Sequence, residues 1–162
     1  MKHAYSIILL LGGGLLIMSA QAQMQHDPAH HSAHPAGTNT GARQEVNFPP
    51  RVKRNTLATM RMHLQGLGEI QQALAEEHYD EAARVATMKL GMSSMYGNQA
   101  AEEAKYMPPG MKQLGAQLHY QAGEFAVAAQ DAAVTGDIRK PLLLLSQMTR
   151  TCVTCHATYK LH

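Results

Sequence analysis

Both cysteines of the chain lie beside a histidine near the C-terminal end, in the segment Cys152-Val153-Thr154-Cys155-His156. This C-x-x-C-H pattern predicts covalent attachment of a c-type haem. Two thiols three residues apart can add to the two vinyl groups on one edge of a porphyrin. The adjacent imidazole can then bind the iron from the proximal face. We therefore predict one haem c, with Cys152 and Cys155 as the thioether residues and His156 as the proximal iron ligand.

Three other uses of the motif fit the sequence less well. A structural zinc site needs four ligands, and no second C-x-x-C or H-x₃₋₅-H pattern lies nearby. A thioredoxin-like redox pair belongs in a βαβ context, which this sequence does not indicate. A disulfide between two helical residues three apart would be strained, because their side chains point apart.

The elements that must position the motif are predicted to be helical. Apolar residues at spacings of three and four predict a helix over residues 52–76. Further helices are predicted over 80–95, capped by Asp80, and over 110–134, with a helical turn in the loop between them. The last helix is expected over 138–160, with Pro141 in its first turn. This pattern favours an all-α fold, an antiparallel four-helix bundle with haem on the C-terminal helix.

The first 47 residues are predicted to lie outside this fold. Residues 1–22 combine a basic start, an apolar run and Ala20-Gln21-Ala22, which predicts a signal peptide cleaved after Ala22 and export to the periplasm. The apolar run is shorter than the ~20 residues that span a bilayer, so no stable membrane anchor is expected. Residues 23–47 lack apolar periodicity and are predicted to form a disordered leader before a haem domain over 48–162.

Histidines are concentrated in this leader. Four of them, at positions 26, 30, 31 and 34, have neutral imidazoles that suit Cu²⁺ or Zn²⁺. A polar leader that binds no metal is the alternative interpretation.

Composition excludes several functions. A net charge of +2 is too small for an electrostatic nucleic-acid binder. Aromatic residues make up only 5% of the chain and Trp is absent, which argues against an all-β fold. The sequence contains no Gly-rich phosphate loop, Ser-His-Asp pattern or paired catalytic carboxylates, so an enzyme is not expected. Six of the eleven methionines, at positions 88, 92, 95, 107, 111 and 148, are assigned to the core, and His78, His119 and His162 to the surface.

The haem motif near the C-terminus, on the last of four predicted helices, resembles the class II cytochromes c, the cytochrome c-prime family. Cys152-x-x-Cys155-His156-x-x-Tyr159-Lys160 matches the family pattern C-x-x-C-H-x-x-Y-[RK], and the resemblance covers residues 48–162. It implies that Tyr159 and Lys160 lie near the haem and that Met92, Met95 and Met107 line the haem pocket. Members of the family commonly form homodimers, and the sequence leaves this point open.

The resemblance also raises the question of a second iron ligand. A low-spin branch of the family uses a methionine of the first helix, and Met60 matches its position. Position 56 is Thr where the family has an arginine, and Arg54 is the nearest arginine. At 100° per residue Met60 lies near the centre of the apolar stripe and His63 near its edge, whereas Met62 projects away and is discounted. Three alternatives remain: Met60, His63, or no protein ligand.

The distal ligand separates two expected functions. A six-coordinate iron predicts one-electron transfer between periplasmic donor and acceptor proteins, with the iron cycling between its ferrous and ferric states. An open distal site predicts a five-coordinate protein that binds NO or CO.

Overall fold

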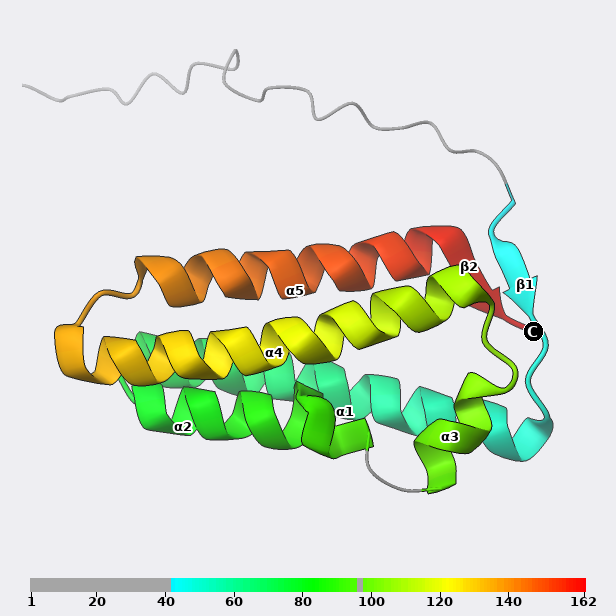
Figure 1. Cartoon of the computed structure of the whole chain (residues 1–162), viewed down its shortest axis with the longest axis horizontal. Helices are drawn as coiled ribbons and strands as arrows, with labels where there is room; N and C mark the ends of the chain where they lie inside the picture. Colours follow the sequence, from blue (N-terminus) through cyan, green and yellow to red (C-terminus); the bar gives the residue numbers. More distant parts are fainter. Residues whose placement is uncertain (1–41, 96–97) are drawn as a thin grey trace, which may run out of the picture. The chain divides into compact units, whose positions relative to one another are not determined.

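A computed structural model of the protein describes residues 42–95 and 98–162. The predicted signal peptide and the four leader histidines lie outside these ranges. Five α-helices and two short strands make up the described part (Figure 1), which confirms the predicted predominance of helix. The α-helices are α1 (Pro50–Ala75), α2 (Tyr79–Val85), α3 (Asn98–Ala104), α4 (Pro109–Thr135) and α5 (Arg139–Thr158). A π-helical turn, η2 (Ala86–Leu90), and a 3₁₀ turn, η3 (Met92–Met95), follow α2.

The long helices begin and end at residues suited to these positions. Pro50 and Pro109 occupy the first turns of α1 and α4, where a missing N–H costs least. α4 ends at Gly136, whose φ of 72° is the left-handed conformation that favours glycine. Asp137 accepts a hydrogen bond from the backbone N–H of Arg139 at 3.0 Å, and its carboxylate also pairs with the Arg139 guanidinium. These contacts define the turn between α4 and α5.

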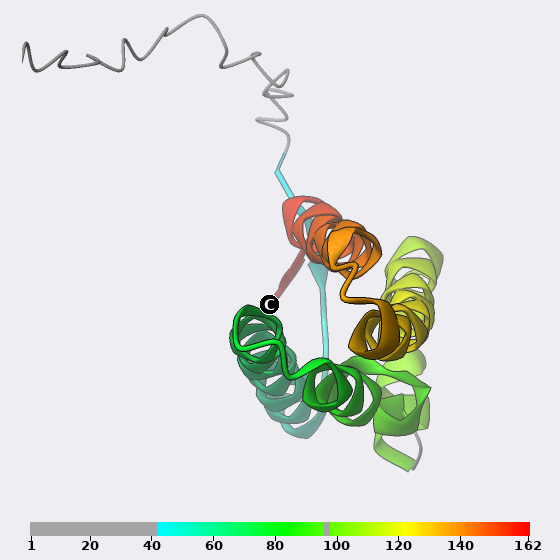
Figure 2. The same ribbon diagram turned by 90° about the vertical axis from the view of Figure 1, so that its left-hand side faces the viewer.

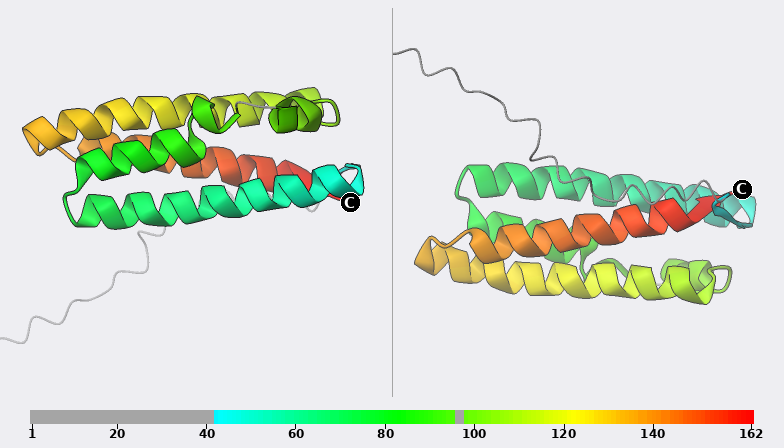
Figure 3. Two further views of the ribbon diagram at one scale, coloured as in Figure 1. Left: turned by 90° about the horizontal axis from the view of Figure 1, so that it is seen from below. Right: turned by 90° about the horizontal axis from the view of Figure 1, so that it is seen from above.

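Neighbouring long helices alternate in direction. α1 and α2 are joined by a tight turn, as are α4 and α5, and the members of each pair run in opposite directions (Figures 1 and 3). In the end view α2 packs between α1 and α4, and α4 packs against α5 (Figure 2). Among the described residues, no helix combines the length and the apolar composition that crossing a membrane requires.

Two apolar clusters stabilise the described part. The main core joins α1, α2, η2, α4 and α5 and contains Ile70, Leu90, Phe125 and Met148 among its fully buried side chains. The second core lies where the strands meet the helices and consists of Val46, Phe48, Val52 and Met111. Burial of these apolar surfaces is the main favourable contribution to folding.

The segment before α1 differs from its prediction. The expected disorder of residues 23–47 is wrong for its last part, because β1 (Gln44–Val46) forms a parallel pair with β2 (Tyr159–Leu161). The register pairs Glu45 with Lys160 and Val46 with Leu161. The two strands are far apart in the sequence and pair only with each other. The sequence near either strand therefore does not predict this sheet.

Two predicted helices also end earlier than expected. The helix over 80–95 changes at residue 86 into η2, where the N–H of Gly91 bonds to the carbonyl of Ala86 at 2.8 Å. The helix over 138–160 ends at Thr158, because Tyr159 takes an extended conformation and enters β2. The helical turn predicted in the loop before residue 110 corresponds to α3.

The buried face of α1 is rotated from the predicted stripe. Its buried positions are Val52, Thr56, Gly66, Ile70, Ala73 and Leu74. Leu57 and Met60 are only partly buried, and Leu64 is 70% exposed. The C-terminal half of the predicted apolar stripe is therefore buried in the main core. Its N-terminal half is only partly buried.

Candidate functional site

The C-x-x-C-H motif occupies the last turns of α5. Cys152 and Cys155 both carry free thiols and are partly buried. Cys152 packs against the main core and Cys155 against the second core. His156 follows at once and is exposed. The helix thus presents two thiols and an imidazole at its C-terminal end, beside the two-stranded sheet.

Burial controls the ionisation of these thiols. It is the main cause that raises the pKa of Cys152 and that of Cys155, and the neighbouring Cys152 raises the pKa of Cys155 further. Both groups are therefore neutral thiols near pH 7. A reactive thiolate pair requires a lowered pKa, which neither thiol has.

A cavity of about 360 Å³ adjoins the motif, and we call it the His156 cavity. α1 contributes Leu57 and Met60 to its wall, and α4 contributes Met111. The end of α5 and the strand β2 contribute the opposite side. The remaining lining residues are Arg43, Lys53, Cys155, His156, Tyr159, Lys160 and Leu161.

Five of the seven predicted site residues meet at this cavity. They are Met60, Cys155, His156, Tyr159 and Lys160, which come from α1, α5 and β2. Cys152 lies one helical turn before His156 on α5 and is not part of the cavity wall. His63 does not line it either. The structure therefore brings Met60, rather than His63, to the cavity that holds His156.

His63 lies instead beside His119 of α4. The two ring centroids are 5.6 Å apart and the rings are nearly perpendicular, at 77°. Within the described ranges the Nε2 atom of His63 is buried and has no hydrogen-bond partner. Burial, with a smaller contribution from His119, lowers the pKa of His63 to about 4. This imidazole is therefore neutral near pH 7.

The prediction that His119 is a surface residue is wrong. Its side chain is buried, with 8% exposed, and its Nδ1 atom lies 2.6 Å from the Leu90 carbonyl oxygen. Because a carbonyl only accepts, Nδ1 is the protonated nitrogen of the neutral ring. Helical spacing carries a signal that indicates this burial, since His119 lies three residues before Ala122, which faces the main core.

Tyr159 is held at the cavity wall by close packing. It follows the last residue of α5, and its backbone N–H bonds to the carbonyl of Cys155. A Cβ atom placed on Gly110 would lie 2.5 Å from the Tyr159 hydroxyl oxygen. Glycine at position 110 therefore lets the phenol approach the first turn of α4.

Lys160 is tied to the other strand. Its Nζ atom lies 2.8 Å from Oε1 of Glu45, its register partner. The hydrogen bond and charge of Lys160 are the main causes that hold the pKa of Glu45 below its usual range. Lys160 also lines the His156 cavity.

Other cations at this cavity were not predicted from the sequence. Arg43 donates a hydrogen bond to the backbone carbonyl of His156 at 3.3 Å, and so satisfies one of the free acceptors at the end of α5. Lys53 lines the cavity from α1, whereas Arg54 is exposed and does not. Thr56 is buried and its hydroxyl bonds to the Val52 carbonyl. Arg43 falls in the predicted leader, so no local pattern placed it here.

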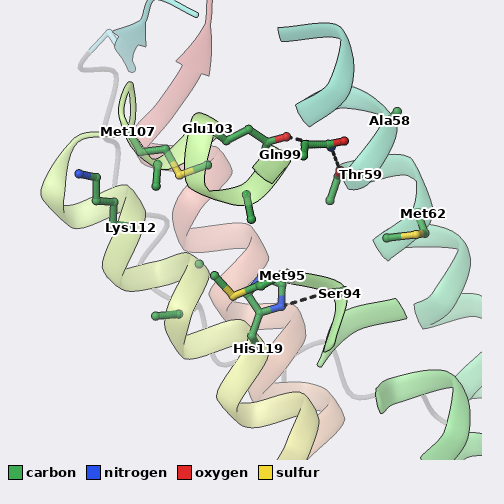
Figure 4. Close-up of a pocket in the computed structure, with 14 residues that line it drawn as sticks. Ala58, Thr59, Met62, Ser94, Met95, Gln99, Glu103, Met107, Lys112 and His119 are labelled. Carbon is green, nitrogen blue, oxygen red and sulfur yellow. Dashed lines mark hydrogen bonds between the residues drawn. The ribbon is translucent and has the colours of Figure 1, made fainter. Parts of the chain in front are cut away.

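Met62 is directed neither to the His156 cavity nor to open solvent. It lines a second cavity, together with Met95 and Met107 (Figure 4). Met92 is exposed. The sequence prediction, which discounts Met62 as an iron ligand, does not include this second cavity.

Comparison of the chain with protein-family models, curated proteins and solved structures finds no match.

Proposed function

We propose that this protein is an exported monohaem c-type cytochrome that carries single electrons between periplasmic redox proteins. The observation that carries the proposal is the His156 cavity, where Met60 of α1 and the Cys155-His156 pair of α5 line one space. A C-x-x-C-H motif is the attachment signature of haem c, and the cavity supplies an apolar wall beside it. We further propose that the long helices form the four-helix bundle of a class II cytochrome c.

The residues at this cavity, together with Cys152 beside it, fit haem c. Cys152 and Cys155 carry free thiols on successive turns of one helix, as two thioether bonds require. Leu57, Met60 and Met111 provide apolar contacts for a flat ring. In this assignment His156 binds the iron from the proximal face, and Tyr159 and Lys160 belong to the surroundings of the ring.

The cations of the cavity suit the two carboxylates of haem. Arg43, Lys53 and Lys160 all lie at its wall. Ion pairs between these side chains and carboxylates would be partly exposed, so each would contribute modestly to binding. We propose that they orient the haem ring. They would replace the arginine that class II cytochromes c have at the position of Thr56.

Met60 is the distal ligand that we propose. Its thioether lies at the cavity wall, whereas His63 faces His119 and would have to leave this contact to approach His156. When bound, the haem supplies reversible gain and loss of one electron at the iron. The protein contributes the axial ligands and the degree of burial, which set the reduction potential, and His/Met ligation raises it relative to two histidines.

The spectrum of the haem-loaded protein tests this assignment. Optical and EPR spectra of the ferric and ferrous protein would be compared with those of Met60→Ala, His63→Ala and Met62→Ala. We expect a low-spin six-coordinate parent whose spectrum is lost only in Met60→Ala. Met62→Ala is the matched control, because this residue lies on the same helix but lines the other cavity.

Two results would change the proposal. Loss of the low-spin spectrum only in His63→Ala would make the site a bis-histidine one. A high-spin five-coordinate parent would contradict a protein distal ligand, and it would favour NO or CO binding over electron transfer.

A further inference from the structure

The second cavity lies between α1, η3, α3 and α4 and has a volume of about 500 Å³; we call it the His119 cavity (Figure 4). Three methionines from three different segments line it: Met62 of α1, Met95 of η3 and Met107, which lies between α3 and α4. His119 of α4 completes the set. None of these four side chains is used in the proposed haem site.

His119 is oriented as a metal-binding histidine is. Its Nδ1–H donates to the Leu90 carbonyl at 2.6 Å, so the lone pair of the neutral ring is on Nε2. Metal-binding histidines usually donate their other ring N–H to a carbonyl or carboxylate, which fixes both the tautomer and the ring orientation. The Leu90 carbonyl supplies this contact at the end of the π-helical turn.

His63 places a second imidazole beside this ring. It meets His119 edge to face, and within the described residues its buried Nε2 lacks a partner. Buried polar atoms in native proteins are nearly always hydrogen-bonded, so an unpaired nitrogen here is unusual. The His119 cavity is thus lined by one imidazole, that of His119, and the His63 ring contacts this imidazole without lining the cavity.

The available donors select the type of metal. Across residues 42–95 and 98–162, no group of three or more His, Cys, Asp or Glu side chains has a metal-binding arrangement. Zinc, calcium and magnesium require such groups. The one carboxylate in the cavity, that of Glu103, already accepts a hydrogen bond from Gln99 at 3.1 Å. Thioethers are soft donors that favour Cu(I), and imidazole also binds copper.

We propose that the His119 cavity binds one cuprous ion through the imidazole of His119 and the thioethers of Met62, Met95 and Met107. Methionines that only fill gaps in a core are surrounded by other side chains. These three are partly buried and line a shared cavity, and Met107 also packs against the second core.

Anaerobic titration of the haem-loaded protein with Cu(I), in competition with a coloured cuprous chelator, tests the proposal. The variant replaces Met62, Met95 and Met107 by Leu, a change that conserves volume. The control replaces Met88 and Met92 by Leu, because both are exposed and neither lines the cavity. We expect the parent and the control to bind one more equivalent than the triple variant, or to bind it at least tenfold more tightly.

The histidines of the leader are common to all three proteins, so their own copper binding cancels in the comparison. X-ray absorption at the copper edge should show sulfur ligands in the parent that are absent from the triple variant. If the triple variant does not fold, Met95→Leu alone should weaken binding severalfold. Equal stoichiometry and affinity in all proteins, or no sulfur ligation in the parent, would overturn the proposal. The haem spectra test the proposed function separately, because the four donors do not include Met60 or His156.

Discussion

Lys160 and Glu45 form an ion pair across the two-stranded sheet, with 2.8 Å between Nζ and Oε1. The pair fastens the segment before α1 to the segment after α5. On the same strands, the N–H of His162 bonds to the Val46 carbonyl at 3.2 Å. This sheet closes one side of the His156 cavity, so the position of the cavity depends on contacts between the two ends of the described chain.

Glu45→Gln should lower the melting temperature by a few degrees at neutral pH, because it removes the charge that pairs with Lys160. The folded-state pKa of Glu45 lies below its ordinary value of 4.5. The ion pair therefore stabilises the fold fully above pH 4.5, and its contribution is lost as the pH falls through the lower folded-state value. Thermal unfolding followed by circular dichroism should show the two proteins converging at low pH. Glu124→Gln, an exposed site outside the sheet, is the control. A difference that persists at low pH would contradict the role of this charge.

Gly110→Ala should destabilise the protein by about 1–3 kcal/mol, because the new methyl group would overlap the Tyr159 hydroxyl. Tyr159→Phe removes that oxygen, and the next ring atom, Cζ, lies at an ordinary 3.7 Å from the Cβ position. The double variant Gly110→Ala/Tyr159→Phe should therefore recover most of the stability measured by denaturant unfolding. Gly115→Ala is the matched control in the same helix; no atom lies within 4 Å of its Cβ position. It should stabilise α4 by about 0.5–1 kcal/mol. Additive losses in the double variant would show that the contact is not the cause.

His63→Leu should reduce the pH dependence of stability between pH 6.5 and 4. Burial holds the folded-state pKa of His63 at about 4, below its ordinary value of 6.5. The neutral ring is compatible with the fold above pH 6.5, and as the pH falls toward 4 the unfolded chain takes up the proton first. The loss is on the order of 3 kcal/mol. Denaturant unfolding at several pH values measures it. An equally steep profile in His63→Leu would assign the dependence to other groups.

Replacing both Cys152 and Cys155 by Ser should abolish covalent attachment of the haem, because no thiol then remains to form a thioether. Each single variant should keep one thioether and retain haem after extraction with acidified organic solvent. Haem staining of the denatured protein after electrophoresis measures the covalent fraction. Val153→Ala, between the two cysteines, should behave as the parent does. Haem that resists extraction from the double variant would contradict the proposed attachment.

Much of the helical structure is encoded locally. The positions of α1 and α4 follow from prolines at their starts and from apolar spacing, and Gly136 marks the end of α4. Such signals act within a few residues, so the sequence predicted these helices to within a few positions. The Cys152–His156 motif is likewise local, because its residues are contiguous in the chain and their spacing alone predicts the haem attachment.

Contacts between distant residues decided the rest. Periodicity placed Met60 on an apolar stripe of α1. Apolar residues occur both in a packed core and in a cavity wall, so the stripe alone does not distinguish the two. Only the packing of α1 showed which part of the stripe faces the His156 cavity. The pairing of Glu45 with Lys160, the burial of His119 against Leu90 and the meeting of three methionines at the His119 cavity join residues from separate elements. The hydrogen bonds and contacts that determine these positions form only when the chain folds, and no local pattern contains them.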